Sequence, residues 1–223
     1  MIDKTVASFD AAVADIPDGA TILIGGFGNA GMPSGLIDAL IAQRAKDLTI
    51  VNNNAGNAET GLAALLKAKR VRKILCSFPR QTDSRVFDSL YRSGEIELEL
   101  VPQGNLACRI EAAGAGLGAI FTPTGYGTRL ANGKETREIN GRNYVLEMPI
   151  HADYAFIQAE KADRWGNLVY RKAARNFGPI MARAARCTIA QVREIVPLGA
   201  LDPEVVVTPG IFVQRVVRMR PPC

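Results

Sequence analysis

Short apolar segments alternate with helical segments over the first 115 residues, and this order limits the folds that the chain can adopt. We predict four strands from compact apolar runs, or from apolar residues alternating with charged ones, at residues 21–24, 48–51, 71–76 and 96–100. Between them, apolar faces of helical period predict one helix that begins at Pro33 and others at residues 62–69, 84–92 and 106–113. This alternation favours an α/β fold, a mostly parallel sheet with helices on both faces.

The end of each predicted strand is where chemistry is expected. Ligands of parallel α/β sheets bind outside the carboxyl ends of the strands, so the loops that follow the strands are the first places to search. The fourth helix is predicted to begin after Asn105, whose side chain can cap a helix, and to end at Gly114.

The pattern changes between residues 122 and 147, where helical periodicity stops and turn residues cluster. Asn140-Gly141 separates two short strand-like runs, which is a strong signal for a β-hairpin. We interpret this segment as a small β-rich insertion within a single domain of residues 1–223. Parallel-type strands are then predicted at residues 154–158, 168–170, 188–192 and 212–217.

Composition excludes several classes of function. Hydrophobic residues make up 48% of the chain and charged residues 22%, as in an ordinary globular domain. The net charge of +5 is dispersed and aromatics are only 6%, which does not suit nucleic-acid binding. No apolar run approaches the ~18 residues of a membrane span, and the first ten residues lack a signal layout, so we expect a cytoplasmic protein.

Cysteine and histidine usage limits the catalytic options further. The four cysteines are scattered singly, which suits a reducing compartment and gives no disulfide framework. His151 is the only histidine, so metal sites built on several histidines are excluded, and we predict no metal site. We interpret His151 as a loop residue with no chemistry.

A glycine-rich turn joins the first predicted strand to the first helix. Residues 25–33 read Gly-Gly-Phe-Gly-Asn-Ala-Gly-Met-Pro. Glycines there allow positive φ and close approach of a ligand to the backbone, and the following helix offers free N–H groups to an anion. The spacing matches neither the dinucleotide-binding GxGxxG pattern nor a P-loop. Taken alone, the segment fits a tight structural turn equally well.

Several blocks in a fixed order resemble the 3-oxoacid CoA-transferases. After the glycine-rich turn come Asn-Asn-Asn-Ala-Gly at residues 52–56, Pro-Gln-Gly-Asn-Leu at 102–106, Thr-Pro-Thr-Gly-Tyr-Gly-Thr at 122–128 and Arg-Lys-Ala-Ala-Arg-Asn-Phe at 171–177. The blocks cover nearly the whole chain. Residues 134–149 are most similar to the branch of the family that uses 3-oxoadipate and succinyl-CoA.

The resemblance implies a family I CoA-transferase fold and a reaction that moves CoA from succinyl-CoA to a 3-oxoacid. In this family a glutamate nucleophile forms a glutamyl-CoA thioester, and that glutamate lies in a Ser-Glu-Asn-Gly stretch of the B half. No such stretch occurs in this chain. The resemblance therefore implies that the chain is the A half of the enzyme and is active only with a B half, in a heterodimer or heterotetramer. Coenzyme A esters are expected as substrates, and no cofactor is expected.

The same resemblance assigns an oxyanion-hole amide to Gln103, which would stabilise the tetrahedral intermediates. The alternative is a loop amide bonded to the backbone. The pocket floor is expected to include four residues of the glycine-rich turn: Gly25, Gly26, Phe27 and Gly28. Phe27 could equally belong to the core.

Two further groups are candidates for substrate binding. Amide donors for the acyl group could come from Asn52, Asn53 and Asn54, although asparagines at such a position also form turns. A dicarboxylate substrate would also need a partner for its second carboxylate, and the candidate cations are Arg80, Arg171 and Arg175.

The chain departs from the family pattern at Cys108, where related chains carry glutamate; we expect Arg109 to lose a neighbouring charge and only local packing to change.

Three alternatives to this function remain open. The acceptor could be acetoacetate or a short fatty acid. The chain could be a non-catalytic regulatory module that binds CoA esters. A sugar-phosphate isomerase of similar architecture is a further enzyme alternative. Sequence alone leaves the stoichiometry of the two halves and the site of the CoA adenine open.

Overall fold

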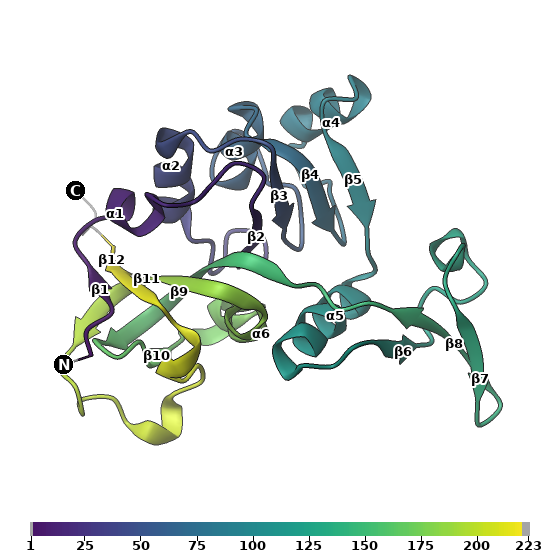
Figure 1. Cartoon of the computed structure of the whole chain (residues 1–223). Coiled ribbons are helices and arrows are strands. Elements are labelled where there is room, and N and C mark those ends of the chain that lie inside the picture. The colour runs from purple at the N-terminus through teal and green to yellow at the C-terminus, as the bar shows by residue number, and fades with distance from the viewer. Residues whose placement is uncertain (1, 220–223) are drawn as a thin grey trace.

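A large, mostly parallel sheet forms the centre of the computed structural model, which describes residues 2–219 (Figure 1). Its eight-strand path runs β1-β12-β11-β9-β2-β3-β4-β5, and β10 pairs with β9. The strands of this sheet are β1 (Thr5–Val6), β2 (Thr21–Ile24), β3 (Leu48–Val51), β4 (Val71–Cys76), β5 (Glu97–Leu100), β9 (Ala152–Asp163), β10 (Leu168–Val169), β11 (Ala185–Val196) and β12 (Arg215–Arg218).

Helices cover both faces of this sheet, as predicted. One apolar cluster packs helices α1 to α4 on one face, and a second cluster packs α5 and α6 on the other. Each face therefore has its own core, which accounts for the continuous apolar runs of the central strands. The helices are α1 (Phe9–Val13), α2 (Ser34–Gln43), α3 (Leu62–Lys67), α4 (Arg85–Arg92), α5 (Gln103–Ala115) and α6 (Gly178–Ala184).

All pairings along the path are parallel, but β10 is antiparallel to β9. The prediction of a parallel-type strand at residues 168–170 is therefore wrong. A tight turn centred on Asp163 causes the reversal, because its Oδ1 atom accepts from the N–H groups of Trp165 and Asn167 at 2.9 and 3.1 Å. An aspartate that satisfies successive backbone donors fixes a short turn.

Helix α5 begins at Gln103, three residues earlier than predicted. Pro102, not Asn105, precedes its first turn, and Gly116 in the left-handed conformation ends it, not Gly114. Asn105 lies inside the helix and is 2% exposed. Its side chain accepts from the Thr122 hydroxyl at 3.0 Å and donates to Glu147 Oε1 at 3.2 Å, so it bonds to the insertion and does not cap the helix.

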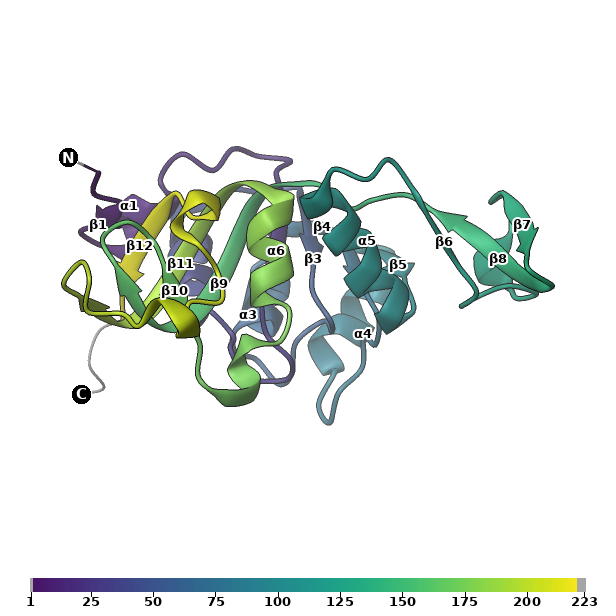
Figure 2. The same cartoon turned by 90° about the horizontal axis from the view of Figure 1, so that it is seen from below.

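The insertion is a separate three-stranded antiparallel sheet of order β6-β8-β7, which stands clear of the main sheet (Figure 2). The Asn140-Gly141 hairpin is confirmed: both residues have positive φ, 52° and 75°, as a two-residue hairpin turn requires. The elements are β6 (Ile120–Thr122), a 3₁₀ turn η1 (Arg129–Ala131), β7 (Thr136–Ile139) and β8 (Arg142–Glu147).

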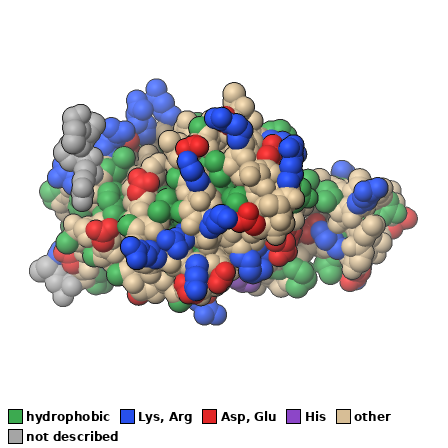
Figure 3. All heavy atoms as spheres, turned by 90° about the horizontal axis from the view of Figure 1, so that it is seen from above, with side chains coloured by type: hydrophobic (Ala, Val, Ile, Leu, Met, Phe, Trp, Pro, Cys, Tyr) green, Lys and Arg blue, Asp and Glu red, His purple; other side chains and the backbone are tan. Residues whose placement is uncertain are grey.

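Short 3₁₀ turns complete the chain: η2 (Lys172–Arg175), η3 (Pro203–Val205) and η4 (Gly210–Phe212). Basic and acidic side chains are intermixed on the face that Figure 3 shows, as the dispersed charge of the sequence predicts. No helix within residues 2–219 is long and apolar enough to cross a membrane. The single-domain assignment stays a prediction, and Cys223 with its two prolines lies outside the described residues.

Candidate active site

The glycine-rich loop leaves β2 at the carboxyl edge of the sheet. Gly25 N–H donates to Phe156 O at 2.8 Å, which continues the pairing of β2 with β9 for one residue. Gly26 and Gly31 have φ of +119° and +73°, and a Cβ atom on Gly31 would clash with the carbonyl oxygen of Ala174. The glycines therefore shape this loop and allow η2 to pack directly against it.

Asn176 holds the glycine-rich loop against the segment that follows η2. Its Oδ1 atom accepts from Gly26 N–H at 3.1 Å, and its Nδ2 atom donates to Ala30 O at 2.9 Å. The loop is closed on itself by two backbone hydrogen bonds between Phe27 and Ala30. Phe27 is 51% exposed, so it is not a core residue. An exposed aromatic ring at this edge is available for contact with a substrate or a partner.

Three consecutive asparagines follow β3 and are all buried. Asn52 Nδ2 donates to Ile24 O at 2.6 Å, and Asn52 Oδ1 accepts from Asn54 N–H at 2.9 Å. Asn54 Oδ1 in turn accepts from Gly56 N–H at 2.8 Å. Asn52 therefore ties the β3 loop to the end of β2, which is a structural use of its amide.

The structure brings Gln103 to Asn53. Gln103 is the first residue of α5, shortly after β5, and its side chain is exposed. Its Nε2 atom donates to Asn53 Oδ1 at 2.8 Å, and the hydroxyl of Ser77 donates to the same oxygen at 2.7 Å. One amide hydrogen of Gln103 is thus held by a buried acceptor, which fixes the direction of the amide group.

The three predicted arginines do not converge. Arg80 Nε pairs with Asp88 Oδ1 on α4 at 2.9 Å. Arg171 lies just before η2 and Arg175 at its end, next to the glycine-rich loop. Arg109 lies 3.3 and 3.8 Å from carboxylate oxygens of Glu99 and Glu147, so it has charged neighbours in this chain, and the effect of Cys108 stays a prediction.

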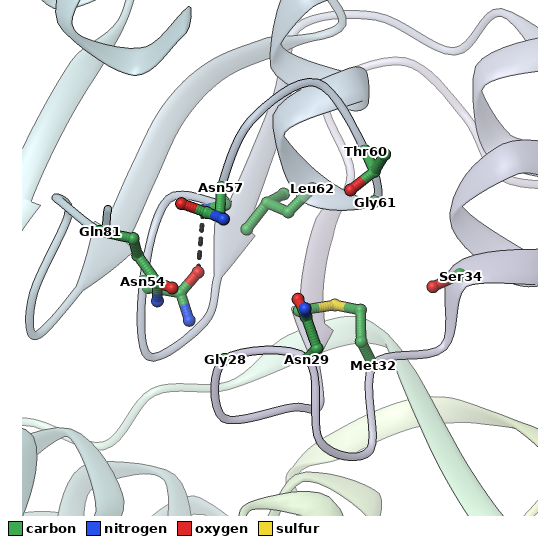
Figure 4. Close-up of a pocket in the computed structure, with 11 residues that line it drawn as sticks. Gly28, Asn29, Met32, Ser34, Asn54, Asn57, Thr60, Gly61, Leu62 and Gln81 are labelled. Atoms are coloured by element: carbon green, nitrogen blue, oxygen red, sulfur yellow. Dashed lines mark hydrogen bonds between the residues drawn. The ribbon is translucent and has the colours of Figure 1, made fainter. Parts of the chain in front are cut away.

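A cavity of about 150 Å³ opens between the glycine-rich loop and the loop that joins β3 to α3 (Figure 4). Of the predicted residues, only Gly28 and Asn54 line it. Sequence reasoning missed the others, although their place after a strand end was a usable signal. The lining consists of Gly28, Asn29, Met32, Ser34, Asn54, Gly56, Asn57, Thr60, Gly61, Leu62 and Gln81.

Several candidate nucleophiles among residues 2–219 are buried or paired with a cation. Burial raises the pKa of the Cys76 thiol, at the end of β4, to about 12, so it stays protonated at neutral pH. Eight of the eleven glutamates pair with lysine or arginine, and no carboxylate lines the cavity. His151 is exposed in the loop before β9. Within residues 2–219, no three His, Cys, Asp or Glu side chains gather as a metal site would require.

Fold and site together define one class of protein. A parallel sheet presents amide donors and glycine-rich loops at its carboxyl edge, and the cavity there contains no carboxylate to act as nucleophile. This arrangement suits an α/β protein that binds an acyl or carboxylate group at the carboxyl edge of its sheet.

The chain belongs to the coenzyme A transferase family, whose model matches residues 6–219. It is 71% identical over 217 residues to the A half of a 3-oxoadipate CoA-transferase from Pseudomonas putida, which covers 97% of this chain and 94% of that protein. It is 46% identical to the A half of a succinyl-CoA:3-ketoacid coenzyme A transferase from Helicobacter pylori J99, over 97% of this chain and 93% of that protein. The resemblance predicted from the sequence is confirmed.

Solved structures agree with this assignment. An acyl-CoA transferase from Escherichia coli O157:H7 superposes with a TM-score of 0.87 at 25% identity, over 97% of this chain and 47% of that chain. The glutaconate coenzyme A-transferase of Acidaminococcus fermentans has a TM-score of 0.86 at 20% identity, over 96% and 75%, and supports the fold alone. The chain thus spans about half the length of the Escherichia coli protein.

Proposed function

We propose that the chain is the A half of a CoA-transferase that moves CoA from succinyl-CoA to 3-oxoadipate. The single observation that carries this proposal is the 71% identity, over 97% of the chain, to the A half of a 3-oxoadipate CoA-transferase. The site geometry supports it, because the carboxyl edge supplies oxyanion donors and no nucleophile.

In this proposal Gln103 stabilises the negative oxygen that develops when a carboxylate attacks the thioester carbonyl. Asn53 accepts one hydrogen of the Gln103 amide, which leaves the other hydrogen to donate to an oxyanion. Ser77 fixes the acceptor in turn. A donor held before the reaction needs no reorganisation in the transition state, which is why such donors contribute strongly to rate.

The nucleophile in this proposal is a glutamate of the B half, which forms first an acyl-glutamyl anhydride and then a glutamyl-CoA thioester. The relatives are named as single subunits of an enzyme, which supports the existence of such a partner. We further propose that coenzyme A esters are substrates, that no resident cofactor takes part, and that the protein acts in the cytoplasm. Arg171 and Arg175 stay predicted contacts to anionic groups of the substrate.

The first experiment is CoA transfer from succinyl-CoA to 3-oxoadipate by the purified chain alone and by the chain co-expressed with its candidate B half. Transfer by the pair and none by the chain alone is the expected result. Transfer by the isolated chain would place a nucleophile in this half and contradict the split site. If the pair binds CoA esters but transfers to no acid, the chain is a binding module and not part of an enzyme.

The acceptor is tested in the same assay. Relatives named for 3-ketoacids are 46–49% identical to this chain, whereas two relatives named for 3-oxoadipate are 69% and 71% identical. We therefore expect a higher kcat/KM for 3-oxoadipate than for acetoacetate. The reverse order would move the assignment to the 3-ketoacid enzymes.

A further inference from the structure

Asn54 lines the cavity of Figure 4, and its side-chain amide carries a buried donor without an acceptor. Asn54 is 1% exposed, and its Nδ2 atom has no hydrogen-bond partner among residues 2–219. The orientation of this amide is fixed, because its oxygen accepts from Gly56 N–H at 2.8 Å and a backbone N–H can only donate. The nitrogen therefore lies on the opposite side, toward Gly28 and Asn29 across the cavity (Figure 4).

A buried donor with no partner costs free energy, so an acceptor atom of a ligand would bind there favourably. The remaining lining is rich in neutral donors and holds no aspartate or glutamate: hydroxyls of Ser34 and Thr60, and side-chain amides of Asn29 and Gln81. Ser34 is also the first residue of the ten-residue helix α2, whose amino end carries partial positive charge. This environment selects an anion over a neutral carbonyl group.

The size of the cavity limits the anion to a small one. Its volume is about 150 Å³. An engineered protein cavity of about 150 Å³ accepts a benzene ring, so a carboxylate with its neighbouring methylene groups fits here, whereas a nucleotide does not. The CoA portion of a thioester is therefore not the occupant.

The cavity is linked to the predicted oxyanion donor through Asn53, the residue before Asn54. Asn54 directly follows Asn53, whose side chain accepts from Gln103 Nε2 at 2.8 Å. A dicarboxylic acid bound across this site would place one carboxyl group at Gln103 and the other at Asn54. Arg80, in contrast, is paired with Asp88 and does not line the cavity.

From this geometry we propose that the cavity binds the non-reacting carboxylate of a dicarboxylic acid substrate, with Asn54 Nδ2 as its central donor. The inference rests on the proposed transferase function and names the substrate class of the same site. Both acids of the proposed reaction, succinate and 3-oxoadipate, carry such a second carboxylate. The site therefore selects dicarboxylic acids over acids that end in a neutral group.

The decisive variant is Asn54→Asp in the co-expressed pair. Aspartate has the same shape and keeps an acceptor for Gly56 N–H, but it turns the donor that faces the cavity into a negatively charged acceptor. The assay measures kcat/KM for CoA transfer from 3-oxoadipyl-CoA to succinate and to succinamate, in which an amide replaces the second carboxylate. We expect the ratio of succinate to succinamate to fall by about tenfold to hundredfold.

The matched control is Asn132→Asp, the same chemical change at an exposed residue of the insertion, which should leave the ratio unchanged. If Asn54→Asp does not assemble, Thr60→Val removes an exposed donor of the same cavity and should lower the ratio by a few fold. A wild-type ratio in every assembled cavity variant would overturn the inference.

Failure of the proposed function gives a different result, namely no transfer to any acid by the wild-type pair. The cavity is then tested by calorimetric titration of succinate and of succinamate into that pair. Tighter binding of succinate that is lost in the cavity variants supports the carboxylate site. Equal binding of the two acids overturns it.

Discussion

Replacement of Gln103 by alanine in the assembled enzyme tests whether the amide of Gln103 acts in catalysis or only stabilises the structure. Gln103 is exposed and makes one side-chain hydrogen bond, to Asn53 at 2.8 Å. Asn53 Oδ1 keeps the hydroxyl of Ser77 as a donor in the variant, so no buried acceptor is left without a partner. We expect the free energy of unfolding to fall by only about 0.5–1.5 kcal/mol, the contribution of one hydrogen bond.

The effect of Gln103→Ala on turnover should be much larger than its effect on the free energy of unfolding. Loss of one oxyanion donor costs about 10²–10³ in kcat, or about 2.7–4 kcal/mol of transition-state stabilisation. Because that donor acts on the tetrahedral intermediate, KM for succinyl-CoA should change little. The assay is steady-state CoA transfer at saturating succinyl-CoA, with thermal unfolding and the mass of the complex measured on the same sample.

A matched control is Gln214→Ala. Gln214 is also exposed, with one side-chain hydrogen bond, accepted from Thr188 N–H at 2.6 Å, and it immediately precedes β12, three strands from β2 in the sheet. It should show wild-type kcat although it loses more stability than Gln103→Ala, because the N–H of fully buried Thr188 loses its acceptor. Wild-type turnover in Gln103→Ala, or an equal loss of turnover in both variants, would refute the oxyanion role.

Three further outcomes test the fold around this site. Gly31→Ala should lower the melting temperature by several degrees, because φ is +73° there and the new Cβ would meet the carbonyl oxygen of Ala174. Hydrogen bonding to Arg215 lowers the pKa of Asp15, so the pair stabilises the fold above the unfolded pKa of aspartate, and this stabilisation is lost as the pH falls through the folded pKa. Asp15→Asn should therefore lower the free energy of unfolding by about 0.2–1 kcal/mol at pH 7 and by progressively less below pH ~4, as measured by chemical denaturation. Cys76, whose pKa burial raises to about 12, should resist alkylation at pH 8 until the chain is unfolded, as peptide mapping would detect.

Each of these expectations has a clear contrary result. An unchanged melting temperature in Gly31→Ala would mean that η2 does not pack on the glycine-rich loop. If the loss of stability caused by Asp15→Asn grew as the pH fell, the pH dependence would have the opposite sign to the one predicted. Rapid alkylation of Cys76 in the folded protein would show that the end of β4 is open to solvent.

The central strands could be predicted to the residue, since burial on both faces makes them continuous apolar runs. The predicted bounds of β2, β3 and β4 are those of the structure. Strands β9 and β11 run to twelve residues each, longer than predicted, and exposed Lys161 and Glu194 pair with each other in the added part. Their polar ends carry no apolar pattern for sequence reasoning to use.

The site was predicted as residue types, but its geometry was not. Gln103 and Asn53 are 50 positions apart, and only the sheet order brings β3 and β5 to the same edge. Asn105 resembles a helix cap in sequence because asparagine suits that position, yet its amide bonds to the insertion. Asn54 Nδ2 lacks a hydrogen-bond partner because the side-chain amide is oriented with its oxygen toward Gly56 N–H. Tertiary contacts set this orientation, and no sequence pattern predicts it.

The edge strand β5 also determines how the protein can associate. Glu97 and Glu99 project from it beside Lys73 of β4, which pairs with both at 2.8 and 2.9 Å. A second β-strand added at this edge would need its own charges to match these glutamates, and two copies placed edge to edge would set like charges against each other. The opposite edge is β1, only two residues long. Both edges of the main sheet thus disfavour the addition of a further strand, which acts against assembly into extended β-fibres.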